Sequence, residues 1–240
     1  MDAFHYIDMF ATKGVEYLLV IAFLAAIVPF WIWLQRSSSE ERPRRLVLET
    51  GAGLALMQRP FAPADVLIDA GHTWVRPARA PGLLAVGIDN LVTEVLGDLD
   101  AIEVPPAGTP LKVGDPLFTL RLGERAWVLP APVDGVVAKI DDDAIARPRS
   151  IIADPYGGEW LTLEPGESTP EPGRLREGER ANAWLDDEFD RLIDLLTSHP
   201  AQATPYFADG AYPAVGVLAR TDDALWQAFQ DHFLTQQRNE

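Results

Sequence analysis

The sequence predicts an α+β protein with a single N-terminal transmembrane helix, a β-rich central domain and helices near the C-terminus. Three observations lead to this fold class: an unbroken apolar run near the start, alternating apolar residues in the centre, and helical apolar spacing after residue 180. The chain's 20 prolines and 18 glycines favour short strands joined by turns over a helical bundle. The predicted segments are 1–14 outside the membrane, 15–35 as the transmembrane helix, 36–65 as a stem, 66–166 as the β-rich domain and 167–240 as a helical extension.

Residues 17–34 form the predicted membrane span. They are 18 consecutive uncharged and mostly apolar positions, close to the roughly 20 residues that cross a hydrocarbon core. The run ends in aromatic residues, which suit the membrane interface, instead of the small residues of a signal-peptide cleavage site. Its proline is tolerated in a lipid-embedded helix. The residues that mark the span are Tyr17, Leu24, Pro29, Trp31 and Trp33.

Cations on either side of the span predict its orientation. Four arginines follow it, whereas Lys13 alone precedes it. Because positive residues favour the cytoplasmic side, we expect an inner-membrane protein with its N-terminus outside and its C-terminal domain in the cytoplasm. The arginines that set this topology are Arg36, Arg42, Arg44 and Arg45.

Composition excludes several classes of function. The net charge of −16 argues against nucleic-acid binding, which requires a basic face for phosphate contacts. The chain has no cysteine, so it has no disulfide, thiolate zinc site or cysteine nucleophile. The four histidines are scattered, and the run of three aspartates at 141–143 lacks calcium-loop spacing, so we expect a solvated turn there and no metal site.

The central segment alternates as half-buried strands do. Apolar residues occupy every second position in stretches of Leu117 to Ile140, and Gly123 and residues 130–135 interrupt the pattern. A helix is predicted after residue 88, because Asp89 can cap its start and Gly97 can end it.

Two amphipathic helices are predicted after the β-rich domain, over 181–198 and 222–234, with one strand at 215–218 between them. The acidic face of the first helix is a candidate docking surface for a protein partner, although any surface helix has a charged solvated face. The candidate docking residues are Trp184, Asp186, Phe189 and Asp190.

Five ordered motifs identify a family resemblance. In chain order they are G-H-T-W-V-R-P at 71–77, V-G-I through L-G-D-L at 86–99, G-T-P-L-K-V-G-D-P-L-F at 108–118, A-P-V-D-G at 131–135 and D-P-Y-G-G-E-W-L at 154–161. In this order the segment 66–166 resembles the H protein of the glycine cleavage system. The resemblance implies a barrel-sandwich fold related to lipoyl domains.

The family's working residue is a lysine in the hairpin before the A-P-V-x-G turn, where it carries lipoic acid as an amide. That position falls on Glu124, with Arg125 beside it, and no lysine lies between Lys112 and Lys139. A carboxylate and a permanently protonated guanidinium cannot be acylated as a lysine amine is. We therefore expect no lipoyl cofactor and no other cofactor.

These features predict a non-catalytic, single-span membrane subunit with a lipoyl-free domain, which acts as a structural or docking component of a respiratory or photosynthetic electron-transfer complex. Its expected partners are the lipid bilayer and other integral membrane subunits. One alternative is a carrier in one-carbon metabolism that uses Lys112 or Lys139. Another is a membrane-fusion or periplasmic adaptor, although such adaptors usually insert a long helical hairpin into the lipoyl motif.

Overall fold

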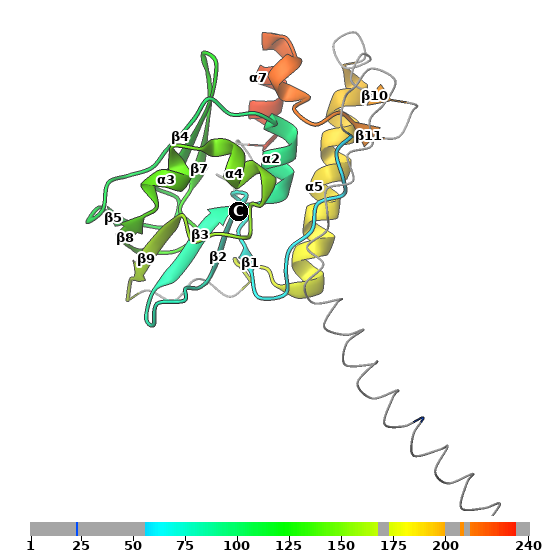
Figure 1. Ribbon diagram of the computed structural model, residues 1–240. Helices are drawn as coiled ribbons and strands as arrows, with labels where there is room; N and C mark the ends of the chain where they lie inside the picture. Colours follow the sequence, from blue (N-terminus) through cyan, green and yellow to red (C-terminus); the bar gives the residue numbers. More distant parts are fainter. Residues whose placement is uncertain (1–22, 24–55, 168–172, 200–206, 209–211, 234–240) are drawn as a thin grey trace, which may run out of the picture. The chain divides into compact units, whose positions relative to one another are not determined.

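The computed structural model describes Phe23 and residues 56–167, 173–199, 207–208 and 212–233 (Figure 1). Apart from Phe23, the predicted span and the four topology arginines lie outside these residues. Within the described part of the chain, no helix is both long and apolar enough to cross a membrane. The prediction of a transmembrane helix over 15–35 therefore stays a prediction.

Two antiparallel sheets make up the β-rich domain. The six-stranded sheet has the order β1-β2-β3-β9-β8-β5, and the three-stranded sheet has the order β4-β6-β7. The strands are β1 (Leu67–Ile68), β2 (Thr73–Pro77), β3 (Leu84–Ile88), β4 (Ala101–Glu103), β5 (Pro110–Leu111), β6 (Pro116–Leu122), β7 (Arg125–Pro130), β8 (Gly135–Ile140) and β9 (Leu161–Pro165).

Large aromatic side chains from both sheets fill the core. Trp74 on β2 and Trp160 before β9 meet edge to face with ring centroids 6.1 Å apart, and Phe118 on β6 lies 5.8 Å from Trp160. Gly87 on β3 makes room for this cluster, since a Cβ there would lie 2.4 Å from the Trp74 ring. The alternating pattern thus does produce a β-rich, barrel-sandwich-like domain.

Helix α2 (Asn90–Leu96) confirms the predicted caps. The Asp89 carboxylate accepts a hydrogen bond from the Val92 N–H, and Gly97 ends the helix at φ 68°. Positive φ favours glycine there, and a Cβ would also lie 2.8 Å from the Cα of Gly216. This close approach brings the segment that follows α5 against the end of α2.

The remaining helices agree only in part with expectation. Helix α5 (Gly178–Ser198) begins three residues before its predicted start, and α7 (Asp223–Phe233) lies within its predicted range. The strand predicted at 215–218 is wrong, because that segment turns and leads into the 3₁₀ helix η2 (Leu218–Arg220). The short strands β10 (Phe207–Ala208) and β11 (Tyr212–Pro213) precede it, and the unpredicted helices α3 (Asp142–Ile145) and α4 (Pro148–Ala153) follow β8.

The segments that precede and follow the β-rich domain in the chain meet beside it. The segment 56–66 runs along α5 before it enters β1 (Figure 1). The Met57 N–H donates to the Pro213 carbonyl at 2.9 Å, and the Gly216 N–H donates to the Glu94 carbonyl at 2.7 Å. The segments flanking the β-rich domain are therefore joined to each other and to α2.

Candidate functional site

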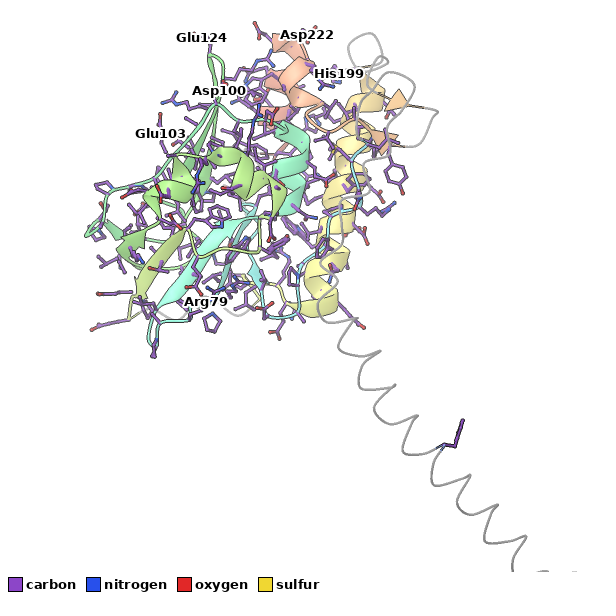
Figure 2. The ribbon with its side chains drawn as sticks, viewed as in Figure 1. Arg79, Asp100, Glu103, Glu124, His199 and Asp222 are labelled. Atoms are coloured by element: carbon purple, nitrogen blue, oxygen red, sulfur yellow. The ribbon has the colours of Figure 1, made fainter. Side chains whose placement is uncertain are left out.

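The β6–β7 hairpin carries the position that the sequence singled out. Leu122 pairs with Arg125, so Gly123 and Glu124 form the turn. The Gly123 N–H donates to an Asp100 carboxylate oxygen at 2.6 Å, which ties the turn to the segment before β4. Glu124 is exposed at the free end of this hairpin (Figure 2). A carboxylate, and not an amine, therefore occupies the hairpin tip.

Arg125 faces the C-terminal extension, 19% of its side chain being exposed. Its guanidinium donates to the carbonyl of Leu218 at 3.0 Å and to that of Thr221 at 2.8 Å. It also pairs with Asp223 at 2.8 Å and lies 5.2 Å from the centre of the Trp226 ring. Arg125 therefore links the hairpin to η2 and to the first turn of α7.

Replacing Arg125 with Met is expected to loosen this link. Met keeps an apolar stem beside Trp226 but removes the donors to two backbone carbonyls, and hydrogen bonds to charged groups each contribute about 1.5–3 kcal/mol. We expect the free energy of unfolding, measured by urea denaturation, to fall by at least about 1.5–3 kcal/mol, the contribution of one such hydrogen bond, because Met can make neither of the two.

The matched control is Arg121→Met on the same hairpin. Arg121 makes an exposed ion pair with Glu103, and exposed pairs contribute little. We expect almost no change in the stability of this control. Equal losses in the two variants would contradict a specific role for Arg125.

Helix α7 packs against β7, the second strand of the hairpin. Trp127 on β7 meets Phe229 edge to face at 4.8 Å, and both are buried. The Gln230 side-chain amide donates to the Ala126 carbonyl at 3.3 Å. Asp222, which caps the helix through the Leu225 N–H, lies with Glu124 at the same end of the domain (Figure 2). The C-terminal extension therefore packs directly on the strand that follows the tip.

The candidate docking residues on α5 have different environments. Phe189 is buried, and half-buried Trp184 packs 5.2 Å from the ring of His72. The side chains of Asp186 and Asp190 are 49% and 63% exposed, and the Arg59 guanidinium pairs with them at 3.0 and 3.1 Å, respectively. Of the four, only the two aspartates thus offer a substantial outward surface. Whether they bind a partner stays a prediction.

The three described histidines lie on different elements, and His5 lies outside the described residues. His72 is buried just before β2, while His199 ends α5 and His232 lies in the last turn of α7. In the described ranges, no group of three or more His, Asp or Glu side chains could hold a metal ion. Asp141 caps α3 through the Ala144 N–H, so the aspartate run begins a helix and does not form the expected turn.

Comparison with known proteins decides the family. The family model for the glycine cleavage H-protein matches residues 67–188. The chain belongs to the glycine cleavage H-protein family. The match includes both sheets, the hairpin and the first half of α5, and it leaves out the segment 56–66 and the extension 207–233.

Two individual H-protein sequences agree with this assignment. The glycine cleavage system H protein of Oceanobacillus iheyensis is 31% identical over 125 residues, which cover 52% of this chain and 98% of that protein. The H protein of Laribacter hongkongensis is 36% identical over 99 residues, 41% of this chain and 77% of its own length. A crystal structure of a glycine cleavage system H protein from Mycobacterium marinum is 26% identical, covering 51% of this chain and 98% of that one, with a TM-score of 0.45.

The β6–β7 hairpin of this H-protein-family member offers no primary amine. The turn offers the carboxylate of Glu124, and the guanidinium of Arg125 is bound to α7. Lys112 lies in the turn after β5, where its amine pairs with Asp134 at 3.1 Å, and Lys139 lies within β8. Neither lysine lies at a hairpin tip.

The role of Arg125 could not be predicted from the sequence. Nothing in the local sequence distinguishes Arg125 from a surface arginine, since its acceptors lie 93 and 96 residues further along the chain. Arg59, whose partners lie 127 and 131 residues away, was missed for the same reason.

Proposed function

We propose that this chain is a lipoyl-free member of the H-protein family and serves as a structural docking subunit in a membrane complex. The observation that carries the proposal is the chemistry of the β6–β7 turn. A carrier of this family needs a primary amine at that turn, and Glu124 supplies a carboxylate that cannot be acylated in its place.

The neighbouring contacts support the same conclusion. A carrier arm must move between partners. In this hairpin, strand β7 is instead fixed to the C-terminal helices through Arg125 and through the contact of Trp127 with Phe229. The segment 207–233, which contains η2 and α7, lies outside the residues that match the family, so this chain adds packing where a mobile group would need space. A rigid scaffold suits docking better than group transfer.

The membrane part of the proposal depends on the sequence. Residues 17–34 have the length and apolarity of a spanning helix, and the arginines after them favour a cytoplasmic body. A net charge of −16 makes anionic lipid an unfavourable surface for the body, so an apolar span is a better anchor than surface charge. Such a helix can pack against other integral membrane subunits, for which an electron-transfer complex is our proposed setting.

Extraction from native membranes tests this function. We expect the full chain to stay in the membrane after a high-salt wash, to require detergent for release, and to co-purify with integral membrane proteins. An Asp186→Asn/Asp190→Asn double variant, compared with an Asp142→Asn/Asp143→Asn control at exposed positions, tests whether the α5 surface contributes to docking. Release by salt alone, or a monomer in mild detergent with no membrane partner, would contradict the proposal.

A further inference from the structure

A buried group of charges joins the loop before β2 to α2, α5 and α7. His72 Nδ1 lies 2.8 Å from an Asp89 carboxylate oxygen, and His72 Nε2 lies 3.8 Å from Glu188. The exposed side-chain fractions are 2% for His72, 0% for Asp89 and 7% for Glu188. The imidazole thus lies between two carboxylates away from water.

Arg191 connects this group to α7. Its guanidinium pairs with Glu188 and donates to the carbonyl of His232 at 2.7 Å. It also lies 4.7 Å from the centre of the Phe233 ring, which itself lies 6.2 Å from the His72 ring. The last turn of α7 therefore rests on the residues that surround His72.

The charges balance only when His72 carries a proton. Asp89 and Glu188 contribute two negative charges, and Arg191 contributes one positive charge, so neutral His72 would leave a buried negative charge without compensation. Burial by itself lowers the pKa of His72, but the charge and hydrogen bond of Asp89 and the charge of Glu188 outweigh it. The pKa of His72 is therefore raised above its ordinary value of 6.5, despite the opposing charge of Arg191.

Other charged groups near His72 belong to a second pair. The Asp69 carboxylate accepts from the Gly71 N–H at 2.8 Å and lies 3.2 Å from Arg174. Burial raises the pKa of Asp69, while the hydrogen bond from Gly71 and the charges of Arg174, Arg176 and His72 oppose that rise. The rings of Trp127 on β7 and Trp184 on α5 also lie beside His72, and they carry no charge.

We propose that His72 is a proton-dependent lock, which holds α5 and α7 against the β-rich domain while its imidazole is protonated and loosens α7 when the proton is lost. The proposed lock rests on the contacts of the last turn of α7 and goes beyond the proposed docking function. The packing of α7 against Trp127 therefore depends on pH.

The direction of the pH dependence follows from linkage. A histidine whose folded-state pKa lies above its unfolded-state value stabilises the fold fully below the unfolded value. That stabilisation is lost as pH rises from about 6.5 through the higher folded pKa. The opening equilibrium of α7 should increase over this window, by up to about tenfold for each unit of difference between the two pKa values.

Two measurements on the detergent-solubilised full chain test the lock. Histidine-labelled NMR should give His72 a titration above 6.5. Hydrogen exchange over 223–233, corrected for the intrinsic effect of pH, should show α7 losing protection across the same window. A His72 titration at or below its ordinary value, or pH-independent protection of α7, would overturn the proposal.

The matched variants are His72→Asn and His199→Asn. His72 has φ 60°, a left-handed conformation that asparagine tolerates, and the asparagine amide can still donate to Asp89. Protection of α7 should become independent of pH in His72→Asn and stay wild-type in His199→Asn. If His72→Asn fails to fold, the pKa of His72 is measured in Glu188→Gln instead. A His72 pKa lower than in the wild type supports the lock, and an unchanged pKa overturns it.

Discussion

Trp74→Ala is expected to lower the free energy of unfolding by about 3–5 kcal/mol, the range for removing a large aromatic side chain from a packed core. Trp74 is fully buried and contacts the rings of Trp160 and Tyr156. Its indole N–H lies 2.9 Å from the carbonyl of Ile88 and 3.2 Å from that of Pro155. The substitution therefore creates a cavity and removes a donor that joins β3 to the loop before β9.

Urea denaturation of the full chain, followed by near-ultraviolet circular dichroism, measures this loss. Val128→Ala is the control, since Val128 lies on β7 with 42% of its surface exposed. Changes at exposed positions usually remain within about 0.5 kcal/mol. A Trp74→Ala protein as stable as the control would show that the two sheets do not depend on this aromatic core.

Glu124→Lys is expected to have the largest chemical effect, because it places a primary amine at the position that we propose corresponds to the family's lipoyl lysine. The turn is exposed, and the contact from the Gly123 N–H to Asp100 does not involve the Glu124 side chain. In cells that lipoylate their own H protein, we expect intact-mass measurement to show one lipoyl group on this variant. The wild-type chain from the same cells should have its unmodified mass.

Arg125→Lys is the matched control for that gain. A lysine at 125 also adds an amine to the hairpin, but its side chain faces the carbonyls of Leu218 and Thr221 beside α7. We expect it to remain unmodified. Modification of Arg125→Lys, or none of Glu124→Lys, would contradict the assignment of the carrier position to residue 124.

Local patterns in the sequence were enough to predict the strands between Leu117 and Ile140 and several helix ends. The alternation from Leu117 to Ile140 appears as β6, β7 and β8, since a strand with one buried face repeats every two residues. Asp89 and Gly97 were predicted as caps of α2 because capping depends on a few neighbouring residues. The position of Glu124 came from the family resemblance, which places it before the A-P-V-D-G turn, and the structure puts it in the β6–β7 turn.

Features that depend on distant contacts could not be predicted. The Val215–Leu218 stretch has the residues of a strand, but the approach of Gly216 to Gly97 at the end of α2 imposes a turn. Phe189 was a candidate for docking because of its place on an acidic helix, yet tertiary packing buries it. The ion pairs of Arg59 and the buried environment of His72 also arise only when the chain folds.

Intact-mass measurement of the native protein, purified from its own membranes, tests the central claim most directly. The claim is that an H-protein-family domain lacks the amine for carrier chemistry and supports docking instead. We predict a polypeptide mass with no lipoyl group on any lysine. A lipoyl mass on the native chain, mapped to Lys112, Lys139 or any other residue, would contradict the account and favour a carrier function.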